Sequence, residues 1–345
     1  MSSGADTKNF IRVLFVDFSK AFDLIDHGIL YKKFIECHFP PHLSAWSLSF
    51  LEGRKQFVKV GNWISSILST KCGAPQGTRA GPNVFKLLSN DLRFDLPYVK
   101  YVDDLSLASI STDPNDSALQ EAVNQLGHWC CLNGMCLNTR KTKEMLIHFG
   151  KRCDKDAISS IHVDGSTLER VETFKLLGVY LSSDMNWSVH IDYIVSKAAK
   201  RFFVISQLVR SGVDKTDIVL VYCAIIRSVL EYACQVWHCG LTKTQACEVE
   251  NVQSRCLRII YPALSYADAL SVTGLDRLDD RRERMVHELF NEVKGPGHAL
   301  NKLLSVYAVD SNKPVTRDTY PYKMPIARTA RLGRSFIAYC INKRM

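Results

Sequence analysis

The chain has 345 residues, with 44 Lys and Arg against 35 Asp and Glu and a formal net charge of +9. A chain of this length can bury a large core and is expected to fold as more than one domain. The positive charge favours a polyanionic partner such as nucleic acid, although many basic proteins bind none. We find no secretory signal, no membrane-spanning stretch and no Cys-x-x-Cys pair among the 12 cysteines. We therefore expect reduced thiols, no membrane partner and an intracellular protein of the nucleus or cytoplasm.

The first expected element is a buried strand that ends in an acid. Residues 12–18 are apolar except for Arg12 and Asp17, which places the Asp17 carboxylate at the carboxyl end of the strand. A helical pattern follows over residues 24–39. Residues 1–10, before the strand, are expected to form a disordered start.

Two stretches with turn-forming residues come next. Residues 53–60 are basic and apolar and indicate a basic hairpin, or equally an ordinary exposed one. The glycines and prolines of residues 73–82 fix a loop against a helix start and allow the backbone to approach a ligand closely. Gln76 in this loop is therefore a candidate contact to a nucleotide or template. An apolar helical pattern follows and ends near Leu92.

An acidic tetrapeptide is the most informative feature of the chain. Asp103 and Asp104 follow Tyr101 and Val102 inside an apolar run, and strand signals on both sides leave the two acids for a tight turn. Adjacent carboxylates repel unless a divalent cation neutralises them, and such oxygen ligands suit Mg²⁺ together with substrate phosphates. Adjacent acids are also common in solvated turns. Asp17, however, supplies the carboxylate on a neighbouring strand that two-metal polymerases need.

Three further patterns follow the acidic turn. A helix is expected over residues 119–130 and a strand over residues 145–149. Between them, residues 137–143 contain Lys141, which is a candidate to protonate or steady a leaving pyrophosphate.

Taken in order, these patterns resemble the reverse transcriptases of non-LTR (LINE-type) retrotransposons. The resemblance rests on five ordered blocks, which are residues 16–23, 73–82, 101–104, 137–143 and 174–181. It implies an RNA-directed DNA polymerase that joins a primer 3′-hydroxyl to a deoxynucleoside triphosphate. Its partners would be an RNA template, a DNA primer and deoxynucleoside triphosphates, and its oligomeric state is left open.

The resemblance also implies roles for single residues. Asp17, Asp103 and Asp104 would be catalytic ligands of two Mg²⁺ ions, with Mn²⁺ as a substitute. Gln76 and Gly77 would belong to the nucleotide and template pocket.

Phe22 bears on the class of polymerase. The resemblance assigns its ring to crowding a ribose 2′-hydroxyl, whereas similar RNA-dependent RNA polymerases place an acid five residues after the first carboxylate. Phe22 is alternatively a core residue of the following helix. By the same resemblance, residues 174–181 would form the primer grip.

The implied fold class is α+β in three parts. Residues 11–181 would form the polymerase palm, an antiparallel sheet backed by helices, with partial fingers. Residues 182–262 would form an all-helical thumb, because their apolar side chains recur every three or four positions. Residues 263–345 would form a helical and basic C-terminal extension.

Charged residues of the last two parts indicate several surfaces. Residues 276–284 alternate acids and arginines, which predicts an exposed helix with internal ion pairs. From Arg317 onward, basic and aromatic residues are interleaved, which suits either single-stranded nucleic acid or packing of the rings onto the thumb. Four thumb cations are candidates to follow a duplex backbone, or to form an ordinary solvated face: Lys197, Lys200, Arg201 and Arg210.

The sequence departs from the family pattern at its start. Family members carry a fingers region, with cations that hold the triphosphate, before the first acidic strand. Only residues 1–10 precede that strand here, so we expect this chain to bind primer–template but to extend it poorly. The alternative is a catalytically inactive, nucleic-acid-binding remnant. An RNA-dependent RNA polymerase or an unrelated α/β domain is disfavoured by the five ordered blocks.

Overall fold

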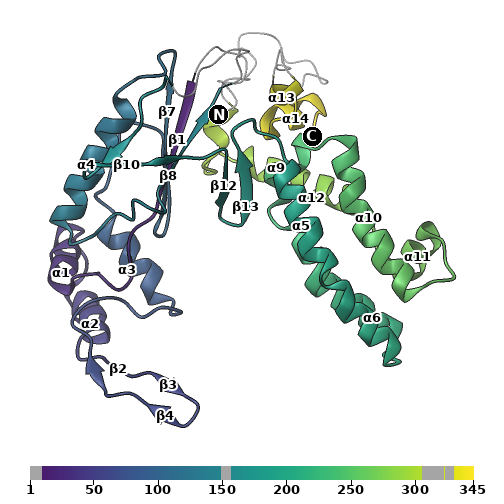
Figure 1. Ribbon diagram of the computed structural model, residues 1–345, viewed down its shortest axis with the longest axis horizontal. Helices are drawn as coiled ribbons and strands as arrows, with labels where there is room; N and C mark the ends of the chain where they lie inside the picture. Colours follow the sequence, from purple (N-terminus) through teal and green to yellow (C-terminus); the bar gives the residue numbers. More distant parts are fainter. Residues whose placement is uncertain (1–9, 149–156, 305–321, 323–329) are drawn as a thin grey trace. The chain divides into compact units, whose positions relative to one another are not determined.

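The computed structural model describes residues 10–148, 157–304, 322 and 330–345. The chain divides into two compact units between Glu172 and Thr173 (Figure 1). The first unit mixes strands and helices, and the second is mostly helical. The division lies before the expected palm–thumb boundary at residue 181. Most of the predicted disordered start lies outside the described residues, but its last residue, Phe10, begins a strand, so that part of the prediction was wrong.

The first unit is built on a five-stranded sheet in the order β11-β8-β1-β7-β6 (Figure 1). Neighbouring strands run antiparallel, except that β11 pairs with β8 in parallel. The prediction of an antiparallel sheet is therefore wrong at this one edge. In chain order the strands are β1 (Phe10–Val16), β6 (Tyr98–Tyr101), β7 (Asp104–Ser111), β8 (Lys143–Ile147) and β11 (Glu169–Arg170). A separate two-stranded sheet pairs β9 (His162–Val163) with β10 (Ser166–Thr167).

The described part of this unit also has four helices: α1 (His27–Glu36), α2 (Pro41–Leu51), α3 (Ala80–Leu88) and α4 (Ala118–Leu132). The helix predicted over residues 24–39 is shorter at both ends. It starts at His27 because the Asp26 side chain accepts a hydrogen bond from the Ile29 N–H and caps α1, and it ends at Glu36. Apolar side chains of α1, α3 and α4 share one buried core with β1 and β7, so helices back the sheet as predicted.

A buried ion triad crosses the sheet. Glu144 on β8 is fully buried, and its Oε1 accepts a hydrogen bond from Arg12 Nε at 2.7 Å. Its Oε2 accepts one from Arg170 Nε at 3.0 Å. A second nitrogen of Arg12 donates to the Ser159 carbonyl at 2.8 Å. Because one carboxylate holds two guanidinium groups from β1 and β11, removal of Glu144 would leave buried charge without its counterion.

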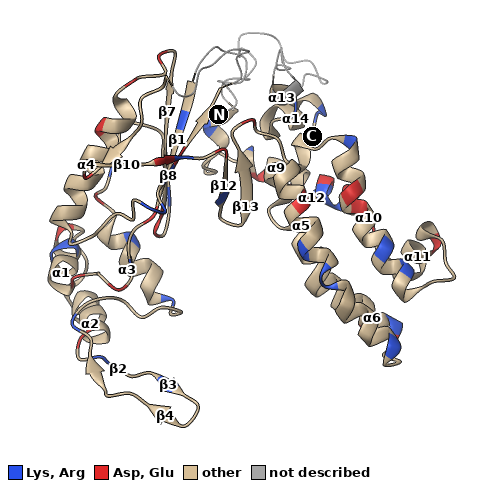
Figure 2. Cartoon of the chain, in the orientation of Figure 1, with Lys and Arg blue, Asp and Glu red and all other residues tan. Residues whose placement is uncertain are grey.

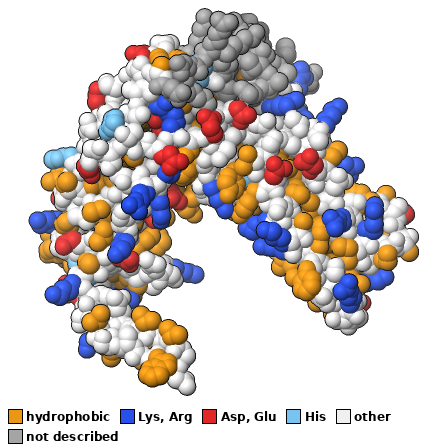
Figure 3. Space-filling model, viewed as in Figure 1, with side chains coloured by type: hydrophobic (Ala, Val, Ile, Leu, Met, Phe, Trp, Pro, Cys, Tyr) orange, Lys and Arg blue, Asp and Glu red, His pale blue; other side chains and the backbone are white. Residues whose placement is uncertain are grey.

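The predicted basic hairpin forms a longer and more apolar ribbon. Strand β2 (Lys55–Gln56) pairs with β5 (Leu68–Ser69), and β3 (Lys59–Val60) pairs with β4 (Trp63–Ile64). Trp63 is 84% exposed, and Figure 3 shows apolar side chains gathered where this ribbon lies in Figure 1. The other large apolar side chains exposed on it are Phe57, Val58, Val60, Ile64, Ile67 and Leu68.

The second unit joins a hairpin to a series of helices. The hairpin consists of β12 (Thr173–Leu176) and β13 (Val179–Ser182). The helices are α5 (Ser188–Ala199), α6 (Phe202–Arg210), α7 (Lys215–Tyr222), α8 (Ser228–Glu231), α9 (Cys234–Trp237), α10 (Lys243–Ile260), α11 (Tyr266–Thr273), α12 (Leu278–Val293), α13 (Ala330–Gly333) and α14 (Phe336–Asn342). A π-helical turn (Cys223–Arg227) joins α7 to α8, and 3₁₀ turns occur at His238–Gly240 and Asn301–Leu303.

The core of the second unit continues past the expected end of the thumb at residue 262. Ile191 and Ile194 of α5 are buried with Tyr222 of α7, as the helical periodicity predicts. Ala269 of α11 and Leu278 of α12 belong to the same core. Part of the predicted C-terminal extension is therefore packed into the helical body.

Helix α12 corrects one prediction. Its arginines were expected to be exposed, but Arg282 is fully buried, with its guanidinium over the Trp237 ring at 5.7 Å. Arg281 pairs with Glu231 of α8 at 2.6 Å, so this ion pair joins two helices. The alternating charges did not indicate these partners, because a periodic pattern describes one helix and not the helices that pack against it.

The aromatic tail is described only in part. Most of the stretch after Arg317 lies outside the described residues. Its predicted contact with single-stranded nucleic acid therefore stays a prediction. Tyr322 and Phe336 lie edge-on to Phe290 of α12, at 6.4 and 6.3 Å. Tyr339 donates a hydrogen bond to Glu283 at 2.7 Å. These three rings therefore pack on α12.

Among the described helices, none combines the length and the apolar character needed to cross a bilayer.

Candidate active site

The acidic tetrapeptide forms the turn between β6 and β7. Tyr101 pairs with Asp104, so the two turn residues are Val102 and Asp103, and Asp104 is the first residue of β7. The prediction that both acids occupy the turn was therefore wrong by one residue. Val102 takes the left-handed conformation, with φ of 57°. A β-branched residue rarely adopts this conformation, so the strand pairing on both sides holds a strained backbone beside the acids.

Asp17 lies where the sequence predicted, directly after β1. Val16 is paired with Leu105 of β7, so Asp17 and Asp104 are the next residues on two adjacent strands. The loop before β8 fixes the Asp17 backbone: its N–H donates to Thr142 Oγ1 at 3.2 Å, and its carbonyl accepts from the Asn138 N–H at 2.8 Å. The block at residues 137–143 thus positions the first acid.

The loop that follows Gly73 is held against residues 22–25. The Ala74 N–H donates to the Phe22 carbonyl at 2.7 Å, and the Gly73 N–H donates to the Ile25 carbonyl at 2.8 Å. Gly73 has φ of 89°, and a Cβ there would lie 2.9 Å from two carbonyl oxygens, so only glycine fits. Gln76 at the tip of the loop is exposed and donates weakly to Asp23 at 3.4 Å.

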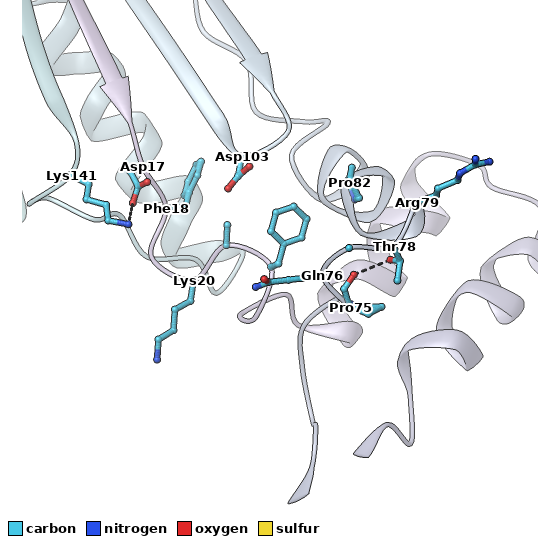
Figure 4. Close-up of a pocket in the computed structure, with 13 residues that line it drawn as sticks. Asp17, Phe18, Lys20, Pro75, Gln76, Thr78, Arg79, Pro82, Asp103 and Lys141 are labelled. Atoms are coloured by element: carbon cyan, nitrogen blue, oxygen red, sulfur yellow. Dashed lines mark hydrogen bonds and ion pairs between the residues drawn. The ribbon is translucent and has the colours of Figure 1, made fainter. Parts of the chain in front are cut away.

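A cavity of about 650 Å³ brings most of the predicted site together (Figure 4). Asp17 at the end of β1 and Asp103 in the β6–β7 turn both line it, although they are far apart in the sequence. Asp104 does not line it. The other predicted residues that do are Phe22, Gln76, Gly77 and Lys141.

Negative charge accumulates where these carboxylates meet. Desolvation is the main cause that raises the pKa of Asp104, and the charges of Asp103 and then Asp17 add to it. In the described part of the chain, no three His, Cys, Asp or Glu side chains form a complete metal site. Mg²⁺ is commonly held by one or two carboxylates with water and substrate phosphates, so the donors at this site fit a metal that arrives with its substrate.

Cations and a ring border the acids. Lys141 Nζ lies 3.9 Å from Asp17 Oδ2, and both side chains are solvent-accessible, so this ion pair is weak. Phe22 is half-buried: one side packs against Phe85, with ring centroids 5.8 Å apart, and the ring also lines the cavity. The core and pocket interpretations of Phe22 are therefore compatible.

Two cations at the cavity were not predicted. Lys20 and Arg79 line it, and in Figure 4 the Arg79 side chain points away from Asp103. Lys20 lies in the block that contains Asp17, and Arg79 lies in the loop block at residues 73–82. A signal for them was thus present in the sequence, because both belong to blocks on which the resemblance rests.

Comparison with known proteins identifies the family of the chain. Residues 4–181 match the family model "Reverse transcriptase (RNA-dependent DNA polymerase)". The chain is 25% identical over 332 residues to the RNA-directed DNA polymerase from mobile element jockey of Drosophila melanogaster, covering 90% of this chain and 35% of that protein. It is also 25% identical over 273 residues to the probable RNA-directed DNA polymerase from transposon X-element of the same organism, covering 74% and 29%. The chain thus spans about a third of the length of these curated relatives.

A solved structure of telomerase from Candida albicans, in complex with a fragment of telomeric RNA, is more distant. It aligns with a TM-score of 0.34 and 11% identity, over 76% of this chain and 49% of that one, which is too remote to support an argument. The family model covers more than half of the chain, and the relatives come from non-LTR elements. The chain therefore belongs to the reverse transcriptase family, with the LINE-type enzymes of non-LTR retrotransposons.

Proposed function

We propose that this chain is the palm and thumb portion of an RNA-directed DNA polymerase that extends a DNA primer on an RNA template. The single observation that carries the proposal is the meeting of Asp17 and Asp103 at one cavity, together with Gln76 and Lys141 from the other blocks. The first unit would be the palm. The helices of the second would be the thumb, and the β12–β13 hairpin the primer grip.

Asp17 and Asp103 would hold Mg²⁺, with Asp104 sharing or tuning the site. A bound divalent ion lowers the pKa of an attacking hydroxyl and neutralises the charge that develops on the phosphates. The protein would align the primer 3′-hydroxyl with the triphosphate in the cavity and balance its charge with Lys141 and Lys20. Lys141 is the candidate to donate a proton to, or to steady, the departing pyrophosphate.

Phe22 would select the sugar. Phe22→Ala is expected to raise the binding of a ribonucleoside triphosphate relative to its deoxy form by about tenfold or more, because it opens space for the 2′-hydroxyl. Competition of CTP against dCTP for the complex with primer–template measures this without requiring turnover. Phe39→Ala, which truncates an exposed ring away from this cavity, is the matched control. An unchanged ratio would assign Phe22 to the core alone.

The second unit carries cations suited to a nucleic-acid backbone (Figure 2). Lys197, Lys200 and Arg210 are exposed, which fits a phosphate-binding face and equally an ordinary solvated face. Arg201 differs, because its guanidinium donates to the Ile225 carbonyl within the helical body. Lys175 of the hairpin and Lys197 both lie over the Tyr193 ring, at 4.4 and 5.7 Å, which joins the hairpin and α5 in one basic surface.

We expect the chain to bind a primer–template duplex with strong salt dependence. If about four phosphates are contacted, affinity should fall about a hundredfold between about 50 and about 200 mM salt, because each contact releases counterions. Filter binding at several salt concentrations measures this. Replacing Lys197 and Lys200 together by Gln should reduce the salt slope, whereas Lys243→Gln and Lys302→Gln, at other exposed positions, form the control pair. Salt-insensitive binding would contradict the proposal.

Primer extension separates the enzyme from the inactive remnant. The same preparation is assayed with an RNA template, a DNA primer and deoxynucleoside triphosphates, in Mg²⁺ and in Mn²⁺. Template-directed extension supports the polymerase. Tight, salt-dependent duplex binding without extension in either metal would favour the remnant.

A further inference from the structure

The β12–β13 hairpin needs support from outside itself. Among the described residues its two short strands pair only with each other, and a lone two-stranded hairpin is marginally stable. Its turn residues, Leu177 and Gly178, both have positive φ, 46° and 86°. This suits a two-residue hairpin turn but strains a leucine. The position of the hairpin must therefore be set by the helices on which it packs.

Tyr232, between α8 and α9, holds the tip of the hairpin. Its hydroxyl donates to the Leu177 carbonyl at 2.9 Å. Its ring covers Gly178 so closely that a Cβ there would lie 3.0 Å from a ring carbon. Tyr232 is itself 55% exposed, so this polar contact can be removed without opening a core.

His190 of α5 holds the second strand. The Tyr180 N–H donates to His190 Nδ1 at 3.4 Å, and the histidine is only 1% exposed. Its Nε2 is buried without a partner in the described residues, so its one hydrogen bond there goes to the hairpin. Burial, and then the charge of Lys175, lowers the pKa of His190 to about 4. The ring is thus neutral near pH 7, and Nδ1 remains an acceptor.

Both contacts rest on one buried ring. Trp237 is fully buried, and its Nε1 donates to the Tyr232 carbonyl at 3.1 Å. The same indole lies 5.5 Å from the His190 ring, measured between centroids. Tip and strand of the hairpin are therefore fixed to a shared, solvent-excluded support and should move with the helices as one body.

We propose that Tyr232 and His190 are positioning residues that fix the β12–β13 hairpin and, through it, the primer 3′ end. The inference rests on the proposed function, in which this hairpin grips the primer. A displacement of about 1 Å at a reacting group can cost about a hundredfold in rate, so anchorage of such a hairpin matters for alignment more than for affinity.

The test reads the position of the primer end and does not require turnover. A primer ending in 4-thiothymidine is bound to the full chain on its template and irradiated, and the crosslinked peptides are mapped. With the wild-type chain we expect a crosslink within residues 173–182. Tyr232→Phe removes one hydroxyl and keeps the ring, and should lower the yield of this crosslink about fivefold, with duplex affinity changed by less than about twofold. Tyr31→Phe, at an exposed tyrosine of the first unit, is the control.

A second pair of variants guards against misfolding. His190→Asn keeps an acceptor near the position of Nδ1 and should retain most of the crosslink, whereas His190→Ala should lose it; hydrogen exchange on α5 and α10 reports whether the helices stay folded. An unchanged yield in Tyr232→Phe, or a wild-type crosslink outside residues 173–182, would overturn the positioning role while leaving the polymerase proposal intact. Absence of duplex binding by the wild-type chain would instead refute the proposed function, and this inference with it.

Discussion

Asp103→Asn is expected to lower the rate of nucleotide addition by about a thousandfold or more, with little change in primer–template affinity, in a form of the protein that carries the fingers region and extends a primer. The substitution keeps the size of the side chain and removes one negative charge from the cavity that Asp103 shares with Asp17. In the proposed function, metal binding needs that charge, whereas cations elsewhere would hold most of the duplex. Single-nucleotide addition in Mg²⁺ and duplex binding, measured on the same preparation, separate the two effects.

A direct metal measurement makes this prediction independent of turnover. Mn²⁺ bound to the complex with primer–template and a triphosphate is followed by electron paramagnetic resonance, and Asp103→Asn should weaken its binding. Asp95→Asn removes an exposed carboxylate from the same unit outside the cavity and should change neither signal. Unchanged addition and unchanged Mn²⁺ binding in Asp103→Asn would remove this residue from the site.

Glu144→Ala is expected to destabilise the first unit by about 3 to 5 kcal/mol, because it leaves Arg12 and Arg170 without their shared counterion. The effect should be largest on β1, which carries Arg12 and is followed directly by the catalytic candidate Asp17. Native-state hydrogen exchange of the β1 amides measures the free energy of opening in this region.

The chain offers a matched control for this prediction. Glu169 pairs with Lys143 at 2.6 Å in the same sheet, but its side chain is 66% exposed. Glu169→Ala should therefore cost less than about 1 kcal/mol, since an exposed ion pair gains little over hydration. Equal costs for the two substitutions would show that burial does not govern the triad.

The sequence alone was sufficient for the features that depend on a few neighbouring residues. The apolar run before Asp17 predicted a buried strand, and β1 ends one residue before that acid. The glycines around Gln76 predicted a loop, which the structure holds against residues 22–25. Local patterns of this kind act over one strand or turn, so they can be read without knowing what packs against them.

Other features were decided only when distant segments met. Pairing of Tyr101 with Asp104 moved the strained turn position to Val102, although local preference favoured an aspartate there. In a helix of alternating acids and arginines, Arg282 was expected to be exposed. Its side chain is instead fully buried, with the guanidinium over the Trp237 ring. In both cases the strand register or the helix packing outweighed the local preference.

The assignment of residues 173–182 to one of the two units also depended on contacts between distant residues. Their sequence resembles the end of a palm, and as a separate hairpin they would be only marginally stable. Tyr232 and His190, which come later in the chain, attach them to the helical unit. The sequence by itself thus determined the order of the functional blocks and the ends of the strands that carry the acids. Only the tertiary structure decided which unit holds the hairpin, because contacts between residues far apart in the chain have no local signature.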